Sequence, residues 1–174
     1  MNDLKYIIKK KNIYFSRVWS FDKYLKLFSN KIKKYKIQQV KIYWFDKKKE
    51  IRGNQVKKHD LKINYNFDIF SHLINLIEII TQKKIEKFEN FKIYRNNMNE
   101  SNFSINIKNI KFNFEISRIK NIRKRYIKIL DQEENFHEIN FSKKNILNQT
   151  KNKRIKKYSY NSSGNLYKML KCFM

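Results

Sequence analysis

Apolar residues recur along this chain in two patterns, one with the period of a helix and one that alternates residue by residue. The helical spacing favours a helix over residues 21–32, with Asp22 near its start. A second helix is expected over residues 69–80, with Asp68 as its N-cap. The second segment carries one broad apolar face, and we therefore interpret it as a helix of the core.

Strict alternation of apolar and polar residues predicts short strands elsewhere in the chain. The segments with this alternation are 40–44, 61–67, 103–107 and 155–160. Residues 110–119 fit either period and stay open between strand and helix. Polar composition predicts loops at 46–60, 95–102 and 131–153, and the last apolar positions favour a short closing helix at 166–173.

The order of these elements predicts a single α+β domain, with an antiparallel-type sheet and helices packed on one face. We place this RNA-binding domain at residues 19–174 and interpret residues 1–18 as a basic N-terminal extension. No internal repeat is visible. The most apolar stretch, residues 69–80, is shorter than the roughly 20 residues that a membrane span needs, so we expect no membrane contact.

Charge changes this picture more than any motif does. The 174 residues contain 41 Lys and Arg but only 15 Asp and Glu, which gives a formal net charge of +26. The excess is dispersed along the chain and interleaved with aromatic residues, which make up 16% of it. Such a surface favours a polyanionic partner, and nucleic acid is the obvious one. The densest patch runs from Arg118 to Lys128; as a helix it would present cations around most of its circumference, and we expect it to contact RNA.

Signals for catalysis are sparse. The chain has no phosphate-binding glycine loop, no nucleophile elbow and no metal-binding pair of cysteines or histidines. Cys172 is the only cysteine, and the carboxylates of Asp131, Glu133 and Glu134 are typical of a solvated loop. We therefore predict a protein that is not an enzyme and that has no cofactor and no metal site.

Composition also bears on where the protein works. Ala and Pro are absent and Gly occurs twice, whereas Lys, Asn and Ile, whose codons are rich in A and T, are abundant. This bias favours an AT-rich organellar genome. No targeting segment is evident, so we expect a mitochondrial location, with the plastid as the alternative.

Several segments, taken in order, resemble the fifth large-subunit ribosomal protein, which binds 5S rRNA in the central protuberance. Thr81-Gln82-Lys83-Lys84 stands where that family has Gly-Gln-Lys-Pro, directly after the clearest helix. Asn90-Phe91-Lys92-Ile93 stands for Gly-Phe-Lys-Ile, and residues 105–109 stand for Val-Thr-Leu-Arg-Gly. Residues 158–170 parallel the closing strand, turn and helix of the family.

The resemblance implies a structural subunit of an organellar large ribosomal subunit, which holds rRNA and lies near the P-site tRNA. Its partners would be large-subunit rRNA, 5S rRNA where present, the P-site tRNA, and neighbouring proteins of the central protuberance and the small-subunit head. Together with the basic patch, it gives the RNA-binding candidates Tyr43, Gln82, Lys83, Lys84, Asn106, Lys108, Arg118, Arg123, Lys124 and Arg125. The loop facing the tRNA would contain Lys92, Arg95, Asn96 and Asn97.

Two other classes stay open from the residues alone. One is another organellar ribosomal protein, of the small subunit. The other is an accessory subunit of an organellar respiratory complex, although that class favours a charge nearer to neutral than +26.

Overall fold

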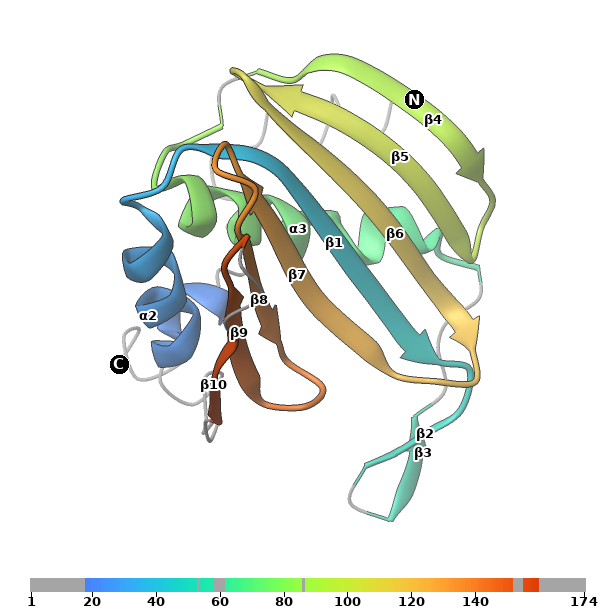
Figure 1. Cartoon of the computed structure of the whole chain (residues 1–174). Coiled ribbons are helices and arrows are strands. Elements are labelled where there is room, and N and C mark those ends of the chain that lie inside the picture. Colours follow the sequence, from blue (N-terminus) through green and yellow to red (C-terminus); the bar gives the residue numbers. More distant parts are fainter. Residues whose placement is uncertain (1–17, 53, 58–61, 86, 152–154, 160–174) are drawn as a thin grey trace, which may run out of the picture.

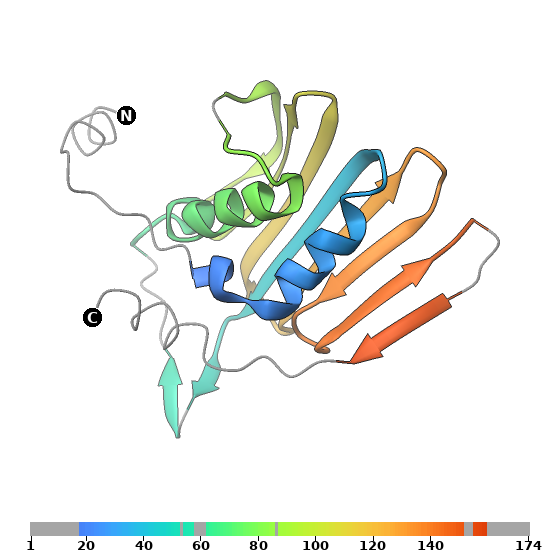
Figure 2. The same ribbon diagram turned by 90° about the vertical axis from the view of Figure 1, so that its left-hand side faces the viewer.

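A large, strongly twisted sheet forms most of the molecule, and two helices cover one of its faces (Figures 1 and 2). The computed structural model describes residues 18–52, 54–57, 62–85, 87–151 and 155–159. The helices are η1 (Val18–Phe21), α2 (Lys23–Ile32) and α3 (Tyr65–Thr81). The strands of the large sheet are β1 (Ile37–Lys47), β4 (Glu89–Asn96), β5 (Glu100–Ile107), β6 (Ile110–Lys120), β7 (Lys124–Asp131), β8 (Phe136–Asn140), β9 (Asn145–Gln149) and β10 (Ile155–Ser159).

The order of the eight strands is β10-β9-β8-β7-β1-β6-β5-β4, and every neighbouring pair is antiparallel except β1 and β6. Strands β6 and β7 are joined by three residues, yet β1 lies between them and pairs with both. A separate two-stranded hairpin, β2 (Glu50–Arg52) with β3 (Gln55–Lys57), extends beyond the end of β1 (Figure 1). The predicted α+β architecture is confirmed at this level.

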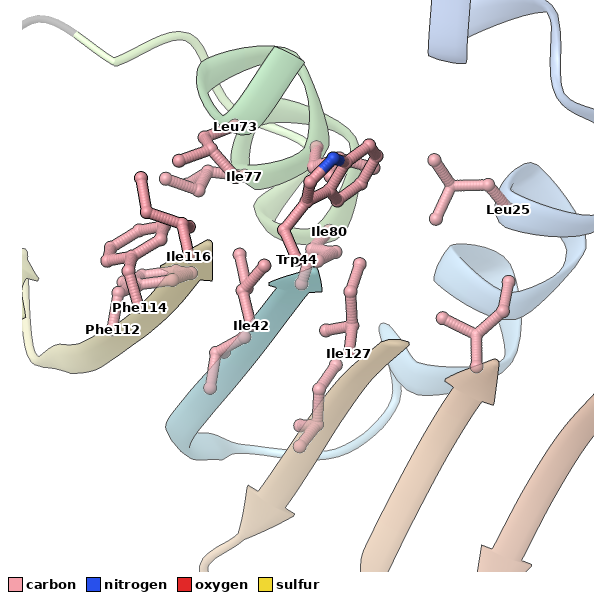
Figure 3. Close-up of a cluster of buried hydrophobic side chains, with 14 of the residues drawn as sticks. Leu25, Ile42, Trp44, Leu73, Ile77, Ile80, Phe112, Phe114, Ile116 and Ile127 are labelled. Carbon is pink, nitrogen blue, oxygen red and sulfur yellow. The ribbon is translucent and has the colours of Figure 1, made fainter. Parts of the chain in front are cut away.

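The core lies between the sheet and the two helices. Alternate residues of the central strands, such as Ile42, Phe114 and Ile127, point toward Leu73 and Ile77 of α3 (Figure 3). The strand period of two places every second side chain on this face, and the helical period places an apolar stripe opposite it. Burial of these stripes is the main apolar contribution to the stability of the fold.

The helices predicted at 21–32 and 69–80 exist, with one boundary corrected. Asp22 caps α2, because its Oδ1 accepts a hydrogen bond of 2.8 Å from the backbone N–H of Leu25. The second helix begins four residues earlier than predicted, and its N-cap is Asn64 rather than Asp68. Asp68 lies in the first turn, where its negative charge suits the helix dipole.

The predicted strand at 61–67 is therefore wrong, since Tyr65 and Phe67 belong to α3. Long-range contact explains the error: the Tyr65 hydroxyl donates to Asp46 Oδ2 at 3.0 Å, and this buried contact holds the first turn of the helix against β1. Local alternation carries no information about such a contact.

Three predicted non-strand segments also form strands. Residues 95–102 are the β4–β5 turn with its flanks, and residues 131–153 contain β8 and β9. The basic patch at 118–128 is not a helix, because these residues form the end of β6, a short turn and β7. Residues 110–119 adopt the strand alternative, as β6. Within β7 and β8, partly exposed side chains alternate with buried ones, a pattern that a purely polar count hides.

The predicted loop at 46–60 contains the small hairpin β2–β3 instead of irregular chain alone. The predicted last strand corresponds to β10. The closing helix at 166–173, Cys172 and most of the N-terminal extension lie outside the described residues.

Phe114→Ala tests the position of the core. Phe114 is 1% exposed and stacks on Phe103 with ring centroids 4.5 Å apart. We expect this substitution to lower the free energy of unfolding by about 3–5 kcal/mol, since it removes a buried ring and leaves a cavity. Ile122→Ala, at a position that is 55% exposed, is the matched control and should change it by less than about 0.5 kcal/mol. Equal effects of the two substitutions in denaturant titrations would contradict this core.

Candidate functional site

Charged and aromatic side chains gather where the two parallel strands β1 and β6 end, on the face that the helices cover. Asp46, from the end of β1, is 5% exposed. Its Oδ1 accepts a hydrogen bond of 2.8 Å from Arg125 Nε at the start of β7 and a second one from the Nη2 of the same arginine. Its Oδ2 accepts from the Tyr65 hydroxyl of α3. The carboxylate thus links two strands and a helix.

Aromatic rings enclose this carboxylate–arginine pair. The Arg125 guanidinium lies 4.5 Å from the centroid of the Trp44 ring. His72 of α3 stacks parallel to Trp44 at 6.5 Å, and Trp19 of η1 meets Trp44 edge-on at 5.3 Å. We call Trp19, Trp44, Asp46, Tyr65, His72 and Arg125 the β1-end cluster.

Electrostatics fix the protonation of most of this cluster. Burial acts to raise the pKa of Asp46, but the Arg125 charge and the hydrogen bonds from Arg125 and Tyr65 outweigh it, so that pKa lies below its usual value. Burial and the neighbouring Asp46 charge raise the pKa of Tyr65 far above its usual value. Asp46 is therefore ionised and Tyr65 neutral near pH 7.

His72 is the member of the cluster suited to proton transfer. Burial, followed by the Arg125 charge, lowers the pKa of His72, so the imidazole is neutral at pH 7. Its Nδ1 is shielded from solvent, and this atom has no hydrogen-bond partner in the structure. A neutral histidine with an unpartnered ring nitrogen has the chemistry of a general base or of a hydrogen-bonding contact to a ligand.

In a second titratable pair, Asp131 with His137, both side chains form hydrogen bonds with neighbouring residues. His137 Nε2 lies 3.1 Å from Asp131 Oδ2, and His137 Nδ1 lies 3.1 Å from Asn148 Oδ1. Asp131 Oδ1 also accepts from the backbone N–H groups of Glu133 and Asn135. We interpret this pair as stabilising the β7–β8 turn and not as a ligand-binding or catalytic site. Among the described residues, no group of three or more metal-binding side chains is present.

The open face of the sheet carries a ladder of aromatic rings and cations. Tyr43 of β1 and Tyr126 of β7 stack at 4.4 Å, and Lys124 Nζ lies 5.2 and 5.0 Å from their two ring centroids. Glu100 at the start of β5 forms ion pairs with Arg95 at 2.9 Å and Lys120 at 3.1 Å. These rings and charged groups pair with one another across neighbouring strands, and such cross-strand pairs stabilise sheets in general.

The structure separates the residues predicted to bind RNA. Tyr43, Asn106 and Lys124 share the open face, whereas Arg125 lies on the helix-covered face. Arg118 is buried, and its guanidinium donates to the Ile63 and Met98 carbonyl oxygens and to Asn99 Oδ1. The positions Gln82, Lys83, Lys84, Lys108 and Arg123 lie at helix ends or turns and are exposed.

The predicted tRNA-facing loop is largely strand and turn. Lys92 and Arg95 belong to β4, while the Asn96 Oδ1 accepts from Asn66 Nδ2 and Ser101 Oγ. Asn97 Oδ1 accepts from the backbone N–H of Glu100 and closes the turn. Whether any of these side chains contacts a ligand stays a prediction.

Comparison with known proteins gives similarity of structure only. No protein-family model matches this sequence, and no curated protein matches it. Among solved structures, a 3-ketoreductase from Actinomadura kijaniata in complex with NADP matches with a TM-score of 0.66 and 6% identity, over 90% of this chain and 49% of that one.

Two further solved structures belong to enzymes of the same broad class. A UDP-N-acetylglucosamine 3-dehydrogenase from Acidithiobacillus ferrooxidans matches with a TM-score of 0.59 and 8% identity, over 84% of this chain and 46% of that one. A dehydrogenase from Chromobacterium violaceum matches with a TM-score of 0.59 and 8% identity, over 90% and 52%. This chain spans about half the length of these enzymes.

These matches overturn the ribosomal interpretation. The fold is shared with oxidoreductases, so the predicted resemblance to the fifth large-subunit ribosomal protein is wrong, and with it the predicted structural role in a ribosome and the predicted rRNA and tRNA partners. The prediction of a protein that is not an enzyme is also contradicted. The small-subunit and respiratory-complex alternatives gain no support either. The motifs behind that resemblance are short and degenerate, and residues 105–109, which stand for a strand motif, run from the end of β5 into the turn before β6.

The described residues do not fit a bound dinucleotide. Dinucleotide sites need a glycine-rich turn between a parallel strand and a helix, whose free N-terminal N–H groups hold the pyrophosphate. Here Asp22 caps α2, and α3 has the Asn64 cap with Asp68 in its first turn, so a carboxylate lies at both helix starts. The sheet is also mostly antiparallel.

No described helix is long and apolar enough to cross a membrane.

Asp46→Asn tests the link between the strands and α3. Removal of the carboxylate charge leaves the mostly buried Arg125 without its counter-ion, and we expect a loss of about 2 kcal/mol in the free energy of unfolding at pH 7. Tyr65→Phe, which removes one hydrogen bond, should cost about 1 kcal/mol. Because the pKa of Asp46 is lowered by folding, its contribution is full above pH ~4 and is lost as the pH falls through the folded value. An Asp46→Asn protein as stable as the wild type at pH 7 would contradict the link.

NMR titration of His72 tests the electrostatics of the cluster. The midpoint should lie below the ordinary value of 6.5, because burial and Arg125 both oppose protonation. Asp68→Asn should lower the midpoint further, since the Asp68 charge favours the imidazolium. A midpoint above 6.5, or an upward shift in the variant, would show that the environment of His72 is different.

Proposed function

We propose that this chain acts as the sheet domain of an oxidoreductase whose dinucleotide is bound by a separate domain. The shared sheet topology over 90% of the chain, with a TM-score of 0.66 to an NADP-bound ketoreductase, is the observation that carries this proposal. The poor fit of the described residues to a dinucleotide supports a nucleotide site on the other domain of such an enzyme.

In this proposal the chain binds the substrate, while the other domain binds the dinucleotide. The β1-end cluster lies at the carboxyl ends of the parallel pair β1 and β6, between the sheet and α3. His72 there is neutral, and its Nδ1 is unpartnered but shielded from solvent, so a substrate reaches this atom only when the neighbouring side chains move. The net charge of +26 favours an anionic substrate. One structural neighbour is a dehydrogenase of a sugar nucleotide, which is a substrate of that charge class.

Dinucleotide binding by the native assembly tests the proposal. The chain, tagged and purified with its natural partners, should raise the fluorescence of NADPH, while the isolated chain should leave it unchanged. With a sugar nucleotide added, the assembly should change the absorbance of the nicotinamide at 340 nm. An assembly that binds no NADPH and no NADH would refute the proposal, and tight binding by the isolated chain would refute the division of roles between domains.

His72→Gln in that assembly separates the substrate role from the nucleotide role. Glutamine keeps a polar side chain but has no basic nitrogen, so turnover should fall while NADPH binding stays as in the wild type. Loss of both properties together would indicate a structural role for His72.

A further inference from the structure

Exposed aliphatic side chains gather at the end of the molecule where β1 and β6 finish. Among the described residues, Ile51 on β2 is the most exposed large apolar side chain, at 73%. Its cross-strand partner on β3, Val56, is 55% exposed, and such partners share one face of a hairpin. Ile63, just before α3, and Ile122, in the β6–β7 turn, are 51% and 55% exposed. We call these four side chains the aliphatic tips.

Backbone contacts bring the three segments that carry these tips to the same end of the sheet. Lys47 at the end of β1 is in register with Lys120 at the end of β6, and the Lys48 N–H donates to the Lys120 carbonyl oxygen at 3.1 Å. The carbonyl oxygen of Ile63 accepts a hydrogen bond of 2.6 Å from Arg118 on β6. The hairpin β2–β3 projects beyond this end (Figures 1 and 2). We call this end the β1–β6 pole.

The β1–β6 pole is also basic. Residues 47–63 include seven Lys or Arg and two Asp or Glu. The side chains of Lys48 and Lys49 are exposed between the end of β1 and the hairpin. The described carboxylates around this end include those of Asp46, Glu100 and Asp68. The first two are buried and paired with cations of the protein, and the third is exposed one turn into α3, so positive charge dominates the surface here.

Aliphatic side chains on projecting segments, with cations around them, fit the interface of an anionic lipid bilayer. Such an interface takes up apolar side chains at the boundary between headgroups and acyl chains, and its phosphates attract lysines. A protein partner fits less well, because a protein interface has a continuous apolar core. The four tips belong to three separate segments, with lysines between them along the chain. A second copy of this chain, with its own charge of +26, would be repelled.

We propose that the β1–β6 pole binds the surface of an anionic phospholipid bilayer, with the aliphatic tips at the headgroup boundary and Lys48 and Lys49 at the lipid phosphates. The expectation of no membrane contact rested on the length of the apolar stretch at 69–80, which bears on a spanning segment and not on a surface contact. The inference goes beyond the proposed function, since it involves neither a substrate nor a dinucleotide.

Sedimentation of the full chain with vesicles tests the charge of the pole. The chain should bind phosphatidylcholine vesicles that contain phosphatidylglycerol, and Lys48→Gln/Lys49→Gln should weaken binding about thirtyfold, since each lysine near an anionic surface contributes roughly fivefold. Lys83→Gln/Lys84→Gln removes the same net charge beyond the other end of α3, about 25 Å away along the helix, and should weaken binding less than about twofold. Equal losses in the two variants would overturn the proposal, because net charge alone would then explain the binding.

A fluorophore at one tip tests whether the pole enters the lipid. Ile51→Cys, made together with Cys172→Ser and labelled with an environment-sensitive dye, should shift its emission to the blue and become protected from an aqueous quencher when these vesicles are added. The same dye at Ile155→Cys, on the edge strand β10 and 59% exposed, is the control and should show neither change. A dye at position 51 that stays open to the quencher on bound chains would overturn the proposal.

A matched pair of polar substitutions separates a lipid surface from other polyanions. Ile51→Asn should weaken vesicle binding about tenfold, because it removes an aliphatic side chain from the lipid, and Ile155→Asn should leave binding unchanged. Circular dichroism checks that both variants are folded. If Ile51→Asn binds the vesicles as tightly as the wild type, the contact is purely electrostatic, as with a nucleic acid or an acidic protein, and the proposal is overturned.

Discussion

Insertion of β1 between β6 and β7 is the constraint on which the rest of the structure depends. β6 and β7 are joined by only three residues, yet they lie two strand spacings apart because β1 occupies the place between them. Val40, Ile42 and Trp44 of β1 thereby reach the centre of the core, and Asp46 reaches Arg125. The core and the β1-end cluster are thus set by the pairing of β1 with β6 and β7, which joins residues about 72 to 94 positions apart in the chain.

Much of this fold is visible in the sequence, because local patterns determine it. The Asp22 cap, the buried stripe with Leu73 and Ile77, and the alternation around Ile42 follow from periods that a single segment displays. The strands in the polar segment 131–153 were not predicted, because β8 and β9 are rich in polar residues such as Glu138 and Asn140, and only a few residues such as Ile139 are buried and apolar. Polarity alone therefore misrepresents a strand that has one solvated face.

The candidate site was much harder to foresee. Asp46 and Arg125 are 79 positions apart, and no local signal distinguishes Arg125 or the buried Arg118 from the other basic residues of this chain. High positive charge favoured a nucleic-acid interpretation, whereas the structure uses several of these cations internally, against Asp46, Glu100 and backbone carbonyl oxygens. His72 lies between apolar positions of a predicted helix, which is a signal in the sequence. Its role depends on Trp44, however, and only the fold brings these two rings together.

The scarcity of glycine has a consequence for the evolution of this backbone. Six described residues other than glycine have positive φ: Asn54, Gln82, Asn90, Lys108, Glu134 and Lys144. Asparagine tolerates this conformation, but a side chain such as that of Lys108 or Glu134 makes it unfavourable by roughly 1 kcal/mol or more. A genome that drifted toward GC-rich codons would make glycine available at these turns. Glycine at these turns would raise the free energy of unfolding, so the fold would tolerate more destabilising mutations elsewhere. Neither the core nor the open face of the sheet would have to change.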